Sequence, residues 1–206
     1  MPHSNVLVID TCLAACQAAV LRDDGRIFVR SEPMERGQQE RLAGLVSETM
    51  AEAGIAFADL ARIGVTVGPG SFTGLRVGLA FAKGLGVALG AEMVGIGALR
   101  ALAAGRPGRV AAVLDARRDQ VHLQLFDDGL ALADPEAVDI AEAVRRLTAL
   151  SPGGLVGSGA LLAASAPGWT DLFVDAPDPA ELAHLVAAAD PAAEPPVPLY
   201  LRGAYA

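Results

Sequence analysis

Small residues recur at every fourth position between residues 74 and 90. They are Gly74, Gly78, Ala82, Gly86 and Gly90. Residues four apart lie on the same face of an α-helix, and each glycine inside a helix costs about 1 kcal/mol relative to alanine. A helical face built from such residues requires a compensating close contact that larger side chains would prevent. The spacing therefore predicts a helix over residues 73–89 with another backbone packed closely against one face.

The overall composition describes a folded protein with an acidic surface. The chain has 206 residues, of which 52% are hydrophobic and 19% are charged. This is enough apolar material for one large domain or two small lobes. The formal net charge is −8, whereas contacts with phosphates require clustered Lys and Arg. We therefore expect that any RNA is held by another component and not by this chain alone.

The N-terminal and apolar segments predict a cytoplasmic protein without a membrane span. Residues 1–10 lack the basic start and apolar run of a secretory signal. The most apolar region, residues 84–105, is interrupted by Glu92 and Arg100, whereas a span requires about 20 predominantly apolar residues. The two cysteines lie four residues apart with no second pair, and the histidines are scattered. We therefore expect buried thiols and no metal site.

The pattern of apolar runs and turn residues repeats in the two halves of the chain. In the first half it predicts strands at 6–9, 16–22, 26–31, 63–67 and 93–96 and helices at 38–53 and 73–89. In the second half it predicts strands at 110–115, 121–126, 155–156 and 172–174, a weak strand after residue 129, and helices at 137–150 and 180–188. Each half thus runs strand-strand-strand-helix-strand-helix.

This order of elements is typical of the ribonuclease-H-like fold. Two copies in tandem give the actin-like (ASKHA) architecture, an α/β fold of two small lobes. The turn Gly-Arg-Pro-Gly at residues 105–108 has the breaking composition expected of a hinge. We therefore predict an N-terminal lobe over residues 1–104 and a C-terminal lobe over residues 105–206, which ends in an irregular, proline-rich tail.

The loop Gly-Pro-Gly-Ser-Phe-Thr-Gly at residues 68–74 invites comparison with phosphate-binding loops. A Walker A loop requires Lys and then Ser or Thr after its last glycine, but Leu75 and Arg76 stand there. The simpler interpretation is a tight turn in which Ser71 or Thr73 caps the following helix. Arg76 keeps anion binding open as the alternative.

Polar residues at the end of the first strand of each half are the candidates for a nucleotide or anion site. Asp10 and Thr11 close the first strand, and Asp115 closes the equivalent strand of the second half. Arg117 could attract an anion, but together with Arg118 it fills the space that backbone amides need to approach phosphate. We therefore predict no tightly bound cofactor. The sequence also contains no His-Glu-x-x-His or Gly-x-Ser-x-Gly motif that would name catalytic residues.

The segment VGPGSFTGLRVGLAFAKGL closely resembles the signature of the TsaB (YeaZ) family, bacterial partner subunits in tRNA threonylcarbamoyladenosine synthesis. Residues 9–11, 40–42, 114–118 and 198–202 are similar to further motifs of that family, so the resemblance covers nearly the whole chain. Gln38 departs from it, because many members carry histidine there.

The resemblance implies a non-catalytic role. The family is a paralogue of TsaD, the subunit that passes the carbamoyl group to the adenosine beside the anticodon. TsaD resembles residues 94–102 of this chain, but it carries two metal-binding histidines where this chain has Ala98 and Leu102, and neither of these can bind a metal. The implied function is to bind and support TsaD, together with the ATPase TsaE. ATP is then used by the complex, and tRNA is contacted only through the complex.

The resemblance also implies where the partner binds. The helices at residues 38–53 and 73–89 are the family's expected contact surface, for TsaD and for a homodimer of the chain when it is alone. The residues expected there are Leu42, Leu45, Gly74, Arg76, Gly78, Ala82 and Gly86. The alternative is that the small-residue face packs only on its own sheet.

Two other functions stay open at the level of the sequence. An active ATP-dependent transferase or kinase of the actin-like fold is opposed by the missing histidine pair and by Arg117 and Arg118. A peptidase, a label once attached to the wider family, would require a nucleophile and a base, and the sequence shows no such arrangement.

Overall fold

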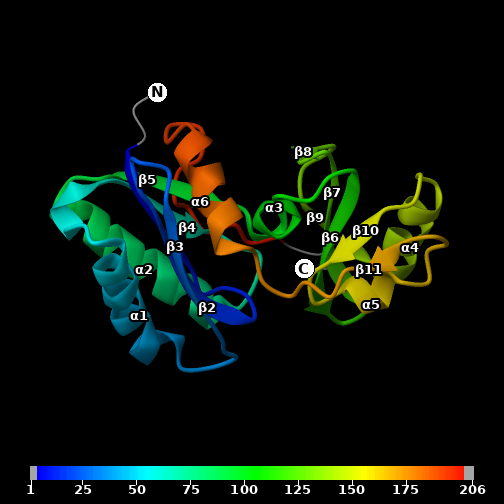
Figure 1. Ribbon diagram of the computed structural model, residues 1–206. Helices are drawn as coiled ribbons and strands as arrows, with labels where there is room; N and C mark the ends of the chain where they lie inside the picture. Colours follow the sequence, from blue (N-terminus) through cyan, green and yellow to red (C-terminus); the bar gives the residue numbers. More distant parts are fainter. Residues whose placement is uncertain (1–3, 202–206) are drawn as a thin grey trace. The chain divides into compact units, whose positions relative to one another are not determined.

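The computed structural model describes residues 4–201, and its contacts divide the chain into two compact units (Figure 1). Of the described residues, the first unit comprises residues 4–101 together with Asp178–Leu199. The second comprises Leu102–Pro177 with Tyr200 and Leu201. Arg202, the last residue of the predicted C-terminal motif, lies outside the described residues.

The first unit is built on a five-stranded sheet with the order β3-β2-β1-β4-β5. β2 is antiparallel to both β1 and β3, whereas β4 is parallel to β1 and β5. In chain order its elements are β1 (Asn5–Asp10), β2 (Ala15–Leu21), β3 (Ile27–Pro33), α1 (Gln38–Ala53), a short 3-10 turn (Phe57–Asp59), β4 (Leu60–Thr66), α2 (Phe72–Leu89), β5 (Glu92–Ile96) and α6 (Pro179–Ala188).

The second unit contains a sheet with the order β11-β10-β6-β7-β8, and β9 also pairs with β7. β7 is antiparallel to β6, whereas β10 is parallel to β6 and β11. Its elements are β6 (Arg109–Arg117), β7 (Gln120–Asp127), β8 (Leu130–Ala131), β9 (Glu136–Asp139), α4 (Ile140–Thr148), β10 (Gly154–Val156), α5 (Ala160–Ala163) and β11 (Thr170–Asp171), and α3 (Ala98–Ala103) spans the division between the units.

The two sheets share one strand order. β6 takes the place of β1, β7 that of β2, β10 that of β4 and β11 that of β5. Two antiparallel strands beside the first strand, followed by parallel strands on its other side, form the ribonuclease-H-like order in each unit. The predicted α/β, actin-like duplication is confirmed.

Side chains that alternate between the two faces of the first sheet form two separate hydrophobic cores, one on each face. Leu7 and Ile9 face the side of the sheet that α1 and α2 cover. Val6 and Val8 face the other side, which α6 covers (Figure 1). Successive residues of a strand point to opposite faces, so a strand that is apolar at both positions must be covered on both sides. This requirement explains why β1 and β4 lie between two layers of helices.

The small-residue face of α2 packs on the sheet of its own unit. An added Cβ at Gly74 would overlap the carbonyl oxygen of Thr11, and one at Gly78 would lie 2.6 Å from the Thr11 Oγ1. An added Cβ at Gly86 would overlap the Met93 side chain, and Ala82 is fully buried. The close contact predicted from the glycine spacing therefore exists, and β1, β4 and β5 provide it.

Local signals place the ends of the two long helices. Gly54 takes a φ of 68° after α1, and its N–H donates to the carbonyl groups of Met50 and Ala51. Ser71 begins α2, because its Oγ accepts from the Gly74 N–H at 3.2 Å. The helix of α1 matches the predicted residues 38–53, and α2 begins one residue before the predicted 73–89. Of the two predicted caps for α2, the structure selects Ser71.

The division into units differs from the predicted lobes 1–104 and 105–206, because Asp178–Leu199 belongs to the first unit. Leu182 and Val186 of α6 are buried on the sheet of that unit. The Arg62 side chain on β4 donates to three carbonyl groups at the end of α6, those of Val186, Ala187 and Ala189. The prediction failed here because adjacency in sequence does not reveal which sheet receives a helix.

Elements of the second unit also differ from the prediction. The predicted helix at residues 137–150 begins only at Ile140, because Glu136–Asp139 forms β9 against β7. The predicted strand at 172–174 lies instead at Thr170–Asp171, where it pairs with β10. Pairing with β7 and with β10 determined where these two strands lie. A short apolar run in the sequence does not reveal which strand it will pair with.

The Gly78 contact predicts a stability difference between two glycines of the same helix. We expect Gly78→Ala to lower the free energy of unfolding by about 1–3 kcal/mol, because the added Cβ crowds the Thr11 Oγ1 in a packed interior. Gly84 is the matched control, since an added Cβ there meets nothing within 4 Å. Gly84→Ala should raise the free energy of unfolding by up to about 1 kcal/mol. Urea unfolding measures both values, and equal stability of the two variants would contradict the close packing.

Candidate functional site

The outer face of α2 carries a second stripe of small and apolar residues, opposite the glycine face. We call it the outer stripe, and it consists of Thr73, Val77, Ala80, Gly84, Val87 and Ala88. Val87 is 86% exposed, and open space surrounds the Cα of Gly84. The spacing of three and four residues places these positions on one side of the helix. An exposed apolar stripe on a helix otherwise packed on its sheet indicates an interaction surface.

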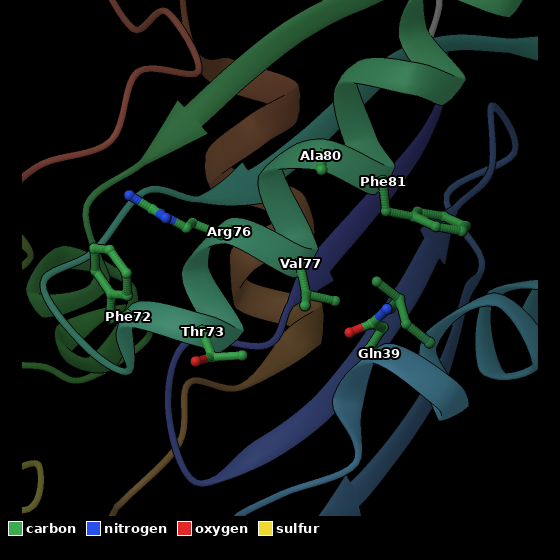
Figure 2. Close-up of a pocket in the computed structure, with 8 residues that line it drawn as sticks. Gln39, Phe72, Thr73, Arg76, Val77, Ala80 and Phe81 are labelled. Atoms are coloured by element: carbon green, nitrogen blue, oxygen red, sulfur yellow. The ribbon is translucent and has the colours of Figure 1, made fainter.

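A groove of about 550 Å³ runs beside the outer stripe, between α1 and α2. Gln39 and Leu42 of α1 line it together with Phe72, Thr73, Arg76, Val77, Ala80 and Phe81 of α2. Figure 2 shows the lining residues Gln39 and Phe81 at one side and Phe72 and Arg76 at the other, with Thr73 and Val77 between them. Most of this lining is apolar. The groove is therefore suited to an amphipathic segment that lays its apolar face against α2.

Arg76 supplies the charge of this groove. Its Cζ lies 3.8 Å from the centroid of the Phe72 ring, a distance at which the ring face attracts a cation. Phe72 itself is 55% exposed. The stacked pair thus presents a guanidinium and an aromatic ring at the surface near the N-terminal end of α2.

The structure corrects most of the predicted interface residues. Leu45, Gly74, Gly78, Ala82 and Gly86 are buried inside the first unit, so they cannot touch a partner of the folded chain. Leu42 lines the groove but is almost completely buried, and Arg76 is exposed there. The glycine face of α2 packs on its own sheet, which is the alternative that the sequence left open. Exposed apolar positions such as Val87 lie elsewhere on the helix, and the spacing of the glycines carried no information about them.

Asp10 and Thr11 do not form an open anion site. Asp10 is 0% exposed, and its Oδ1 accepts hydrogen bonds from the Thr66 Oγ1 at 2.5 Å and the Cys12 N–H at 3.1 Å. The Thr11 Oγ1 donates to the Gly74 carbonyl at 2.7 Å. The loop before α2 thus lies directly on the end of β1. Asp10 and Thr11, predicted as candidates for a nucleotide or anion site, are buried and engaged in hydrogen bonds within the chain.

The buried carboxyl group of Asp10 is only partly satisfied. Its Oδ2 has no hydrogen-bond partner, and the Cys12 thiol donates to the Thr66 hydroxyl at 3.2 Å instead. Burial raises the pKa of Asp10 above 3.8, although hydrogen bonds from Thr66 and Cys12 oppose the change. Burial likewise raises the pKa of the Cys12 thiol. Burial thus disfavours the charged forms of both groups, as expected for side chains in a dry interior.

Arg117 lies in the second unit, at the tip of the β6–β7 hairpin. Its side chain is 86% exposed and pairs with the Asp115 Oδ2 at 3.1 Å, while its N–H donates to the Asp115 Oδ1 at 2.7 Å. Arg117, Arg118 and Asp119 all take positive φ values, between 51° and 66°. The structure therefore does not bring Arg117 into one unit with Asp10 and Thr11.

The backbone donors around the hairpin of the second unit are engaged within the chain. The Asp115 N–H donates to the Ser158 hydroxyl at 3.2 Å. The Gly157 N–H donates to the Val174 carbonyl, and the Gly159 N–H donates to the Val113 carbonyl. A phosphate loop requires such amides to point at the ligand. These three amides are not available for that purpose.

The positions of the two implied metal ligands are part of the core. Ala98 is fully buried and Leu102 is fully buried as well, and both belong to α3. Within residues 4–201, no group of three His, Cys, Asp or Glu side chains is placed to hold a metal ion.

Helix α2 is, among the described residues, the one helix long and apolar enough to cross a membrane by length and composition. It covers the sheet of the first unit with its glycine face, and 33% of its apolar window is buried there. Core helices of soluble proteins meet the same criteria. The packing of α2 on β4 favours that interpretation.

The buried Asp10 predicts a pH-dependent stability. Since its pKa is raised in the folded chain, folding favours the protonated acid. This stabilisation is complete below about pH 3.8 and is lost as the pH rises through the pKa of the folded state. We expect Asp10→Asn, which is neutral at every pH, to gain stability relative to the wild type as the pH rises from below 3.8 to neutrality.

Urea unfolding at the two pH values measures this difference. Asp134→Asn is the control for the substitution itself, because Asp134 is exposed. A loss of stability in Asp10→Asn that is equal at both pH values would contradict a neutral buried acid.

A family model and curated relatives identify what this chain is similar to. Residues 31–173 match the model described as "TsaD: tRNA N6-adenosine threonylcarbamoyltransferase". An uncharacterized protein of Mycobacterium tuberculosis is 36% identical over 97% of this chain and 92% of its own length. The tRNA threonylcarbamoyladenosine biosynthesis protein TsaB of Escherichia coli is 36% identical over 57% of this chain and 52% of its own length.

Solved structures agree with the fold. A Pseudomonas aeruginosa protein described as similar to the peptidase YeaZ superposes with a TM-score of 0.81 at 25% identity, over 97% of this chain and 100% of its own. YeaZ from the same organism gives a TM-score of 0.82 at 24% identity, over 96% of this chain and 100% of its own, which supports the fold alone. With the family model covering more than half of its residues, the chain belongs to the TsaB (YeaZ) family, a branch of the wider TsaD family.

Proposed function

We propose that this chain is a non-catalytic subunit of the machinery that makes threonylcarbamoyladenosine in tRNA. In this proposal it binds and supports TsaD, with TsaE, while the complex threonylcarbamoylates the adenosine beside the anticodon at the expense of ATP. The relatives named TsaB biosynthesis proteins support the pathway. The exposed outer stripe of α2 is the observation on which the proposed partner role rests, because exposed apolar surface of this kind is typical of a protein–protein interface.

The groove and the outer stripe together favour a helical partner. Ala80 and Gly84 are exposed and have small or no side chains, so the axis of an incoming helix can approach α2 closely. Val77 and Phe81 flank them and offer apolar area. Two helices from this chain and two from a paralogous subunit would pack as a small bundle around these residues. TsaD is the natural partner, because a paralogue of the same fold presents equivalent helices.

The burial of the polar residues at the ends of β1 and β6 favours a non-catalytic role over a catalytic one. Asp10 and Thr11 are covered by the loop before α2, and the amides near Asp115 are used within the chain. Ala98 and Leu102 fill core positions where the resemblance implies metal ligands in TsaD. The chain would then act in the complex by binding TsaD through its surface, and nucleotide would be bound by other subunits. We place this assembly in the cytoplasm, and tRNA would reach the chain only through the complex.

The same surface can serve two copies of the chain when no partner is present. An isolated chain would leave the outer stripe of α2 exposed to water, and self-association would cover part of it. We therefore propose a homodimer for the chain alone, which gives way to the complex with TsaD. Sedimentation velocity of the chain with and without TsaD measures both states.

Reconstitution tests the proposed function directly. Unfractionated tRNA is incubated with threonylcarbamoyl-adenylate, TsaD and TsaE, with or without this chain, and the modified nucleoside is quantified by mass spectrometry. We expect modification to depend on the chain and the chain alone to be inactive. Modification by the chain alone, or full activity without it, would refute the proposal.

A substitution on the outer stripe tests the docking surface. We expect Ala80→Arg to weaken binding to TsaD at least about 10-fold, because the long side chain separates the two helices, while Ala80 is exposed and tolerates the change in the folded monomer. Ala187→Arg on α6 is the matched control, since Ala187 is exposed on the opposite side of the sheet. Isothermal titration calorimetry measures both affinities. Equal affinities for the two variants would place the interface elsewhere.

A further inference from the structure

We propose that Arg76 selects the partner of the groove, by pairing with a carboxylate on a helix of a different chain and disfavouring a second copy of this chain. The inference rests on the proposed function, because it concerns the same groove. It adds the chemistry by which that groove distinguishes the two partners. Among the eight lining residues, Arg76 is the charged one, and the others are apolar or neutral polar.

The guanidinium of Arg76 is held in place before any partner arrives. Its Cζ lies over the Phe72 ring at 3.8 Å, and Figure 2 shows both side chains at the same end of the groove. A cation stacked on a ring loses less conformational freedom on binding than a free side chain does. The planar fork of donors also remains open at its edge to accept two oxygens of one carboxylate.

Arg76 has no recorded carboxylate partner among the described residues. It is the fifth residue of α2, and the first turn of the helix contains no acidic residue. Most arginines of the first unit have carboxylate partners, such as Arg41 with Glu32 and Arg62 with Glu92. Among residues 4–201, the recorded ion pairs include neither Arg76 nor Arg36, but Arg36 does not line the groove. A carboxylate from another chain that enters the groove would therefore meet an unpaired cation at Arg76.

Symmetry explains why a second copy is the poorer partner. In a two-fold pair each groove meets the same groove of the other copy, and the lining residues include no carboxylate that could pair with Arg76. Glu40 follows the lining residue Gln39, but consecutive residues on a helix point in directions about 100° apart, and Glu40 does not line the groove. In the self-pair the guanidinium of Arg76 would therefore meet no carboxylate among the lining residues, whereas a paralogous helix with an acidic residue would neutralise it.

The test measures, for the wild type and for one variant, the affinity for TsaD and the affinity of the chain for a second copy of itself. Arg76→Met keeps the length and apolar stem of the side chain and removes the charge. We expect it to weaken binding to TsaD about 10- to 30-fold, as for the loss of one member of a largely desolvated charge pair, and to strengthen self-association about 3- to 10-fold. Isothermal titration calorimetry measures the first affinity and sedimentation equilibrium the second. A change of both affinities in the same direction, or an unchanged affinity for TsaD, would overturn the proposal.

Lys83→Met is the matched control, because Lys83 is an exposed cation of α2 that does not line the groove. It should change neither affinity by more than about twofold. Added salt should weaken the TsaD complex of the wild type and leave that of Arg76→Met nearly unchanged. If the wild-type chain does not bind TsaD, the proposed function and this inference fail together. If it binds and Arg76→Met binds equally well, only this inference fails.

Discussion

The close contact between α2 and the end of β1 is the constraint on which the rest of the first unit depends. Gly74 and Gly78 allow the backbone of α2 to reach Thr11, whose hydroxyl then donates to the Gly74 carbonyl. No larger residue fits at these positions without displacing Thr11. The contact fixes the height of α2 above the sheet. It thereby also determines which side chains of α2 point outward.

The same contact has a chemical consequence at the end of β1. In an actin-like lobe this strand end is a natural place for a polar ligand, but here the loop before α2 covers it. Asp10 is closed in with Thr66 and Cys12, and its pKa is raised by burial. The carboxyl group of Asp10 is thus buried out of contact with water, in a setting that disfavours its charged form. Close packing makes this strand end part of the interior.

Packing on one side leaves the other side of α2 free for association. Apart from the cations Arg76 and Lys83, the exposed positions of α2 carry small or apolar residues, and exposed apolar surface of this kind favours association. Its sheet covers the glycine face, and the groove beside α1 with the outer stripe remains. The chain thus combines a filled strand end with an uncovered helix. This combination is the basis of the proposed role as a partner subunit.

The sequence by itself determined the two repeats, the limits of α1 and α2, the close packing of the glycine face and the family. Each of these follows from local spacing, since glycines four apart mark one helical face wherever the helix lies, and Gly54 ends α1 through its own φ. The tertiary structure alone decided that β1, β4 and β5, and not a partner, meet the glycine face, that α6 returns to the first sheet, and that Asp10 is sealed from solvent. These depend on which surfaces meet in space, and a periodic pattern reports that a face is buried without reporting what buries it.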